Sequence, residues 1–176
     1  MSSAYIVAAV RTAGARKASR LSGWHPADLA GKILDALVDR VNADPALIED
    51  VIMGCVTQTG EQALNVARNA VLSSKLPDSV PGTSVDRQCG SSQQAIHFAA
   101  QAVMSGAMDI VIAAGVESMS RAPLGLSVQL PAKNGFGQPT GMNMGARYPG
   151  VQFSQFSGAE MMARKYELSK DRLDEY

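Results

Sequence analysis

The chain has 176 residues, of which 46% are hydrophobic and 18% are charged. A chain of this length can bury one sizeable core, so we expect one domain with an appendage. Its sixteen basic side chains balance sixteen acidic ones, which argues against a protein that binds nucleic acid by neutralising phosphates. The apolar run from Ala4 to Val10 is too short to span a bilayer. It also lacks the basic start and the small-residue cleavage site of a signal peptide. We therefore expect a cytoplasmic protein with no nucleic-acid partner and no membrane span.

Apolar runs alternate with helical periodicities through the first two thirds of the chain. The runs predict buried strands over residues 5–10, 51–56, 83–87 and 110–114, and the periodicities predict helices over 26–41, 64–76 and 91–105. This βαβαβαβ order indicates a mainly parallel sheet covered by helices on both faces. Ligand chemistry is then expected at the carboxyl ends of the strands.

The periodicity ends after Met119, and residues 121–158 are rich in glycine and proline. So long an irregular stretch predicts a loop excursion that serves as a lid or a binding loop, or else disorder. A helix is expected to resume over 159–167, and Ser169 is expected to cap another helix with Asp171 in its first turn. Because the chain stops inside that helix, at Tyr176, we expect a truncated chain.

The chain has two cysteines, Cys55 and Cys89, so it offers neither a disulfide framework nor a four-thiolate metal site. Cys89 lies between a predicted strand and the helix that opens at Ser91, where helix N–H groups and the positive dipole end favour a thiolate. Gly90 permits a sharp turn there, and Ser91 and Ser92 are small enough to leave room for a substrate. Cys89 is therefore the predicted nucleophile, whereas Cys55 lies within a strand and is predicted to fill the core.

A cysteine nucleophile needs a base, and the two histidines are His25 and His97. His97 is eight residues along the helix from Cys89, about 12 Å away at 1.5 Å per residue, which is too far for a direct hydrogen bond. We expect His97 to pack within its helix. His25 is expected to cap the first helix, with a role as the base as the alternative.

Two other patterns carry weaker signals. A basic stretch could face a phosphate-bearing ligand, although a solvated loop is the favoured interpretation; its members are Arg11, Arg16, Lys17 and Arg20. The segment Gly135-Phe136-Gly137 follows no strand and opens no helix, so it lacks the context of a phosphate-binding glycine loop.

Four motifs occur in the order and spacing found in one enzyme family. They are Ile6-Val7-Ala8-Ala9-Val10-Arg11-Thr12, Asn65-Val66-Ala67-Arg68, Val85-Asp86-Arg87-Gln88-Cys89-Gly90-Ser91-Ser92-Gln93-Gln94-Ala95-Ile96 and Gly115-Val116-Glu117-Ser118-Met119-Ser120. The third closely resembles the nucleophile segment of thiolases. The resemblance covers all 176 residues, but these correspond to the N-terminal half of a thiolase. The Asn-Glu segment, the Gly-His-Pro histidine and the second cysteine of the family's C-terminal half do not occur.

The resemblance implies an α/β fold with a mainly parallel, five-stranded mixed sheet and helices on both faces. Residues 1–120 would form this domain, residues 121–176 would begin a loop domain, and the C-terminal half would be absent. Cys89 would accept the acyl group of a 3-ketoacyl-CoA and pass it to CoA, or run the reverse condensation. CoA would be a substrate, no cofactor or metal would be bound, and the protein would form a homodimer or a dimer of dimers.

Three departures from the family pattern bear on the site. Many thiolases have Asn where this chain has Asp86 and Gln where it has Leu64, so the hydrogen bonding behind the nucleophile is expected to differ. Where short-chain biosynthetic enzymes carry His-Met-Gly, this chain has Ser154-Gln155-Phe156. Ser154 and Gln155 are thus candidate substrate-binding residues, and they favour a degradative enzyme acting on longer or bulkier acyl chains.

Two other functions stay open at this level. A β-ketoacyl synthase resembles thiolases in fold and also uses a cysteine at a helix start, although its nucleophile follows Thr-Ala rather than Arg87-Gln88. A non-catalytic module that binds acyl-CoA or assists assembly is the other alternative, because this chain lacks an evident base. The alternatives would be separated by a thiolysis assay.

Overall fold

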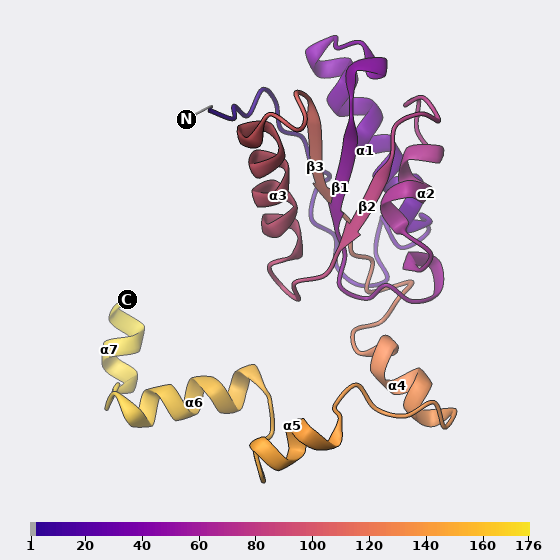
Figure 1. Ribbon diagram of the computed structural model, residues 1–176. Helices are drawn as coiled ribbons and strands as arrows, with labels where there is room; N and C mark the ends of the chain where they lie inside the picture. The colour runs from indigo at the N-terminus through magenta and orange to yellow at the C-terminus, as the bar shows by residue number, and fades with distance from the viewer. Residues whose placement is uncertain (1–2) are drawn as a thin grey trace. The chain divides into compact units, whose positions relative to one another are not determined.

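The computed structural model describes residues 3–176. The chain divides into two compact units, the first ending at Gly135 and the second spanning Phe136–Tyr176. The first unit contains the sheet and the helices that pack on it (Figure 1). The fold is α/β, as the sequence predicts, and the candidate nucleophile belongs to the first unit.

Three parallel strands form the sheet. They are β1 (Asp50–Gly54), β2 (Gly82–Val85) and β3 (Val111–Gly115), arranged in the order β2-β1-β3. Ile52 of β1 pairs with Thr83 of β2 on one side and with Ala113 of β3 on the other. All three strands occur within a residue or two of the predicted ranges, but the five-stranded mixed sheet is wrong for the described residues, which form three strands with parallel pairing throughout.

The strand predicted over residues 5–10 is also wrong. This segment belongs to no strand, and Tyr5, Ile6 and Val7 are more than four-fifths exposed. An apolar run becomes a strand only where a neighbouring strand offers hydrogen-bonding partners. In the sheet of the described residues, β1 pairs with β2 and β3, and none of the three strands pairs with residues 5–10.

Helices cover both faces of the sheet, as expected. On one side lie α1 (Pro26–Val41) and α2 (Val66–Leu72), and on the other lies α3 (Ser91–Ser105) (Figure 1). Successive side chains of β1 alternate between these layers: Val51 and Met53 pack in the core with α1 and α2, whereas Ile52 packs with α3. The nearly continuous apolar pattern of β1 is the consequence of this two-sided burial.

The bounds of α1 and α3 agree with the prediction. His25 caps α1 as expected, since its Nδ1 accepts a hydrogen bond from the N–H of Ala27 at 3.3 Å, and Pro26 takes the first helical position. The predicted helix over 64–76 is shorter in the structure. Leu64 and Asn65 both adopt positive φ, so Asn65 becomes the N-cap of α2 by accepting from the Arg68 N–H.

The stretch predicted as an irregular excursion contains short helices, and that part of the prediction is wrong. They are α4 (Leu126–Lys133) in the first unit and α5 (Met142–Arg147) in the second, followed by α6 (Gln155–Lys165) and α7 (Lys170–Glu175). Helix α6 begins earlier than expected. Ser169 caps α7 as predicted, because its hydroxyl accepts from the Arg172 N–H.

Two 3₁₀ turns, η1 (Pro45–Leu47) and η2 (Gly60–Gln62), complete the connections that flank β1. Among the described residues, no helix is long and apolar enough to cross a membrane.

Candidate functional site

Cys89 lies in the turn between the carboxyl end of β2 and the start of α3, where the sequence places it. Its side chain is exposed. The backbone reverses here through Gln88, which has a φ of 47°, and α3 begins two residues after the cysteine, at Ser91. Cys89 therefore directly precedes the N-cap residue, Gly90, at the positive end of a fifteen-residue helix.

Local hydrogen bonds close the turn. The N–H of Gln88 donates to Oδ1 of Asp86 at 2.7 Å, and the N–H of Gly90 donates to the carbonyl of Arg87 at 3.0 Å. The buried Ser91 hydroxyl accepts from the Arg87 N–H at 2.9 Å and donates to the Gln88 carbonyl at 2.6 Å. The exposed Asp86 and the buried Ser91 therefore both stabilise the turn by hydrogen bonds. Because Ser91 is buried and bonded, it does not leave the room for a substrate that the sequence suggested.

Two glycines let the first turn of α3 lie directly against the sheet. A Cβ at Gly54, the last residue of β1, would collide with the backbone of Ser91 and Ser92. A Cβ at Gly115, the last residue of β3, would overlap the Ser92 hydroxyl. Sequence reasoning did not single out these glycines, although each ends a predicted apolar strand, which is a signal for close backbone approach.

Cys55 is buried, with 1% of its surface exposed, and it packs in the main core as predicted. Desolvation by burial raises the pKa of its thiol to about 12, and the negative charge of Glu117, a hydrogen bond to that carboxylate and the charge of Asp86 act in the same direction. Cys55 is therefore a neutral thiol near neutral pH, and the thiolate is the reactive form. Of the two cysteines, Cys89 is the exposed one.

Polar contacts join the loop after β1 to the segment after β3, at the same edge of the sheet. Glu117 accepts from the Val56 N–H at 2.7 Å, from the Thr57 N–H at 3.2 Å and from Nε2 of Gln62 at 3.1 Å. Oε1 of Gln62 in turn accepts from the Ser118 N–H at 2.6 Å. The sequence resemblance includes Glu117, but no role for it could be read from the pattern.

A paired interaction joins the same two loops a second time. Nε and Nη2 of Arg121 contact the two carboxylate oxygens of Glu61 at 2.7 and 2.6 Å. This hydrogen-bonded pairing lowers the pKa of Glu61 and raises that of Arg121. Such bidentate pairs fix geometry as well as charge. The loops after β1 and β3 are therefore joined twice, by the contacts of Glu117 and by the Arg121–Glu61 pair.

The two histidines occupy different places. His97 lies on α3 and is exposed, so the prediction that it packs within its helix is wrong for this chain. His25 serves as the helix cap of α1, with its Nδ1 already accepting a backbone N–H. The four residues of the basic stretch are all exposed, which agrees with a solvated loop.

Ser154 and Gln155, the candidate substrate-binding residues, belong to the second unit. Ser154 is the N-cap residue of α6, and its side chain makes no capping hydrogen bond. Gln155 is exposed in the first position of that helix.

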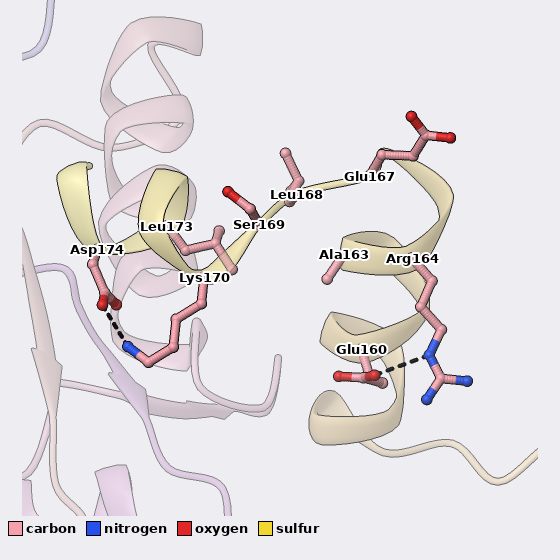
Figure 2. A pocket seen from close by; sticks show the side chains of 9 residues that line it. All are labelled: Glu160, Ala163, Arg164, Glu167, Leu168, Ser169, Lys170, Leu173 and Asp174. Atoms are coloured by element: carbon pink, nitrogen blue, oxygen red, sulfur yellow. Dashed lines mark hydrogen bonds and ion pairs between the residues drawn. The ribbon is translucent and has the colours of Figure 1, made fainter.

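A shallow hollow lies between α6 and α7 within the second unit (Figure 2). Ion pairs flank it, one between Glu160 and Arg164 at 2.9 Å and one between Lys170 and Asp174, and Leu173 contributes apolar surface. These pairs link residues four apart on exposed helices and contribute little to stability. The lining is mixed in charge and open to solvent, so it shows no preference for one ligand class.

Within residues 3–176, no three His, Cys, Asp or Glu side chains are grouped so that they could hold a metal ion. The exposed thiol of Cys89 lies just before the start of α3, whose first turn packs against the carboxyl ends of β1 and β3.

Comparison with known proteins agrees with this geometry. The family model described as "Thiolase, N-terminal domain" matches residues 4–176. The steroid 3-ketoacyl-CoA thiolase FadA6 of Mycobacterium tuberculosis (strain ATCC 25618 / H37Rv) is 44% identical over 178 residues, which cover all of this chain and 44% of the relative. The beta-ketoadipyl-CoA thiolase of Escherichia coli is 39% identical over 168 residues, which cover 95% of this chain and 42% of the relative.

A solved structure shares the fold. The acetyl-CoA acetyltransferase of Bacillus anthracis matches with a TM-score of 0.68 and 30% sequence identity, over 90% of this chain and 41% of that protein. The chain thus spans less than half the length of these relatives. Because the family model covers nearly the whole sequence, the chain belongs to the thiolase family through its N-terminal domain.

Proposed function

We propose that Cys89 is the acyl-accepting nucleophile of a thiolase that transfers an acyl group between a 3-ketoacyl-CoA and CoA. The observation that carries the proposal is the contrast between the exposed Cys89 thiol at the start of α3 and the buried, protonated Cys55. In the cleavage direction the Cys89 thiolate attacks the 3-keto carbonyl, and the bond between C2 and C3 breaks. The acyl group remains on sulfur as a thioester, acetyl-CoA leaves after its C2 carbanion gains a proton, and CoA then takes the acyl group.

The proposed substrates are 3-ketoacyl-CoA thioesters with longer or bulkier acyl chains, from the breakdown of lipids. Support comes from Ser154 and Gln155, which replace the His-Met pair of short-chain enzymes, and from the name of the 44% identical steroid 3-ketoacyl-CoA thiolase. CoA is a substrate in this scheme, and the scheme requires no bound cofactor or metal.

Incubation of the chain with an acyl-CoA donor should add one acyl group, detected by intact mass and mapped by proteolysis to Cys89. Cys89→Ser should lose this adduct entirely, because a serine hydroxyl has no comparable anionic form near neutral pH. The matched control is Cys55→Ser, which removes the other thiol and should leave the adduct on Cys89. Acylation of Cys55, or an undiminished adduct in Cys89→Ser, would exclude the assignment.

We also propose that the protein forms a homodimer or a dimer of dimers. Within the described residues β2 is paired on one side only, and exposed strand edges are normally protected. Light scattering at high protein concentration should therefore give a multiple of 18.5 kDa. Thr83→Lys, which adds charge on this edge strand, should lower the association, whereas a wild-type monomer would contradict the proposal.

The remaining assignments are proposals of the same kind. They comprise a cytoplasmic location, a boundary after residue 120 between the α/β domain and the loop domain, and the absence of nucleic-acid partners. The family match favours a thiolase over the β-ketoacyl synthase alternative. A module that binds acyl-CoA without turnover is tested by the first experiment in the Discussion.

A further inference from the structure

The contacts of Glu117 are unusual for an exposed carboxylate, because its partners lie inside the protein. Thr57 and Gln62 have 2% and 0% of their surface exposed. Nε2 of Gln62 donates both to Glu117 and to the Thr57 carbonyl, the latter at 2.9 Å. The carboxylate thus satisfies donors that the loop after β1 would otherwise leave unpaired. The proposed acyl transfer assigns no role to this group.

The loop that Glu117 holds is in direct contact with the strand that leads to the nucleophile. The N–H of Cys55 donates to the carbonyl of Val85, the last residue of β2, at 3.0 Å. On the other side, the Val116 N–H donates to the Gly54 carbonyl at 3.0 Å. The end of β1 and the residue after it are therefore hydrogen-bonded to the end of β2 on one side and to the segment after β3 on the other.

The ends of β1 and β3, from which these loops start, also contact the first turn of α3, which directly follows Cys89. Gly54 immediately precedes Cys55, and Gly115 stands two residues before Glu117. Both glycines lie so close to the first turn of α3 that a Cβ at either would collide with Ser92. A displacement of the loop after β1 would move Gly54, and α3 would move with it because no free space separates them.

We propose that Glu117 is a positioning residue for Cys89: by holding the loop after β1 against the sheet, it fixes the turn that presents the thiol at the start of α3. The carboxylate is suited to this because both of its oxygens accept hydrogen bonds and it donates none. An amide in its place would put an NH2 group at one of the two oxygen positions, where it would face the N–H of Val56 or that of Thr57. The proposal rests on the proposed role of Cys89, but it concerns thiol reactivity and can be tested without turnover.

The test is the rate at which iodoacetamide alkylates Cys89 in the Glu117→Gln chain, followed by peptide mass mapping. At about pH 7.5 the rate should fall about two- to fivefold, the effect of losing a helix-terminus interaction of about 0.3–1 kcal/mol. At high pH, where both proteins carry the thiolate, the rates should converge. Cys55 is the internal control, because a merely unfolded variant would expose Cys55 and label it faster.

Glu49→Gln is the matched control. Glu49 is also an exposed glutamate that joins β1 to β3, since its Oε2 accepts from the N–H groups of Asp109 and Ile110, but at the opposite end of the strands. Its loss should leave the rate of Cys89 alkylation at the wild-type value, even if stability falls as much as in Glu117→Gln. Equal slowing in both variants would show a general stability effect and overturn the proposal.

If Glu117→Gln does not fold, Gln62→Met serves as the second variant, because it keeps the approximate side-chain volume and removes one donor to Glu117. The expected effect has the same sign and is smaller. Wild-type alkylation of Cys89 at every pH in the variant that folds would overturn the proposal. The wild-type acylation experiment separately tests the nucleophile, so failure of the acyl transfer and failure of the positioning role are distinguishable.

Discussion

The 176-residue chain, assayed by itself, is expected to show no thiolase turnover even with Cys89 intact. Completing the reaction requires a group that deprotonates CoA and donors aimed at the developing oxyanion. Removal of each such group costs about 10²- to 10⁴-fold in rate. We expect neither histidine of the chain to supply the base, because His97 is eight residues from Cys89 along the chain and His25 caps α1.

The measurement is a steady-state thiolysis assay with acetoacetyl-CoA and longer 3-ketoacyl-CoA substrates. Intact mass should verify that the sample ends at Tyr176, and Cys89→Ser supplies the background rate. Activity comparable to that of a complete thiolase would contradict the expectation, and His25→Ala would then be the first variant to test for a base. Acylation of Cys89 without turnover would show that the chain forms the acyl-enzyme and lacks its second step.

Gly54→Ala is expected to destabilise the first unit by about 1–3 kcal/mol or more, a typical cost of overpacking. The reason is that the added methyl group meets the backbone of Ser91 and Ser92 rather than a side chain that could rotate away. Relief of the collision requires α3 to move from the sheet, so Cys89 is displaced as well. Urea unfolding measures the loss as a lower midpoint at an unchanged slope.

Gly14→Ala is the control, because a Cβ at Gly14 has no neighbouring atom within 4 Å. Its stability should lie within about 0.5 kcal/mol of the wild type, as for most surface substitutions. Gly115→Ala should cost less than Gly54→Ala, since its first contact is the Ser92 hydroxyl, which is a side-chain atom. Wild-type stability of Gly54→Ala would show that α3 is not held tightly against β1.

Local patterns were sufficient to predict most elements of the first unit. The four-residue apolar repeat and Pro26 predict α1 with its observed bounds. The helical pattern that opens at Ser91 and closes at Gly106 likewise predicts α3 with its observed bounds. These signals are local because capping and side-chain periodicity involve residues within a few positions of one another. The shortening of α2 could not be predicted so easily, since it depends on positive φ at Leu64 and Asn65.

The position of Cys89 at a helix start could likewise be predicted from the sequence, because a strand, a turn and a helix start are consecutive there. The residues that surround this turn could not be predicted. Gly54, Gly115 and Glu117 are separated from Cys89 by 26 to 35 positions in the sequence, and the parallel pairing of β1 with β2 and β3 brings their segments to one edge of the sheet.

The sequence by itself thus determined the family, the candidate nucleophile and the order of the central helices and strands, since each depends on residue types at short spacing. The tertiary structure alone decided which apolar runs became strands. Residues 5–10 have the composition of a buried strand, yet they belong to no strand, and the sheet of the described residues consists of β2, β1 and β3. Backbone hydrogen bonds between distant segments, rather than local composition, decide membership of a sheet.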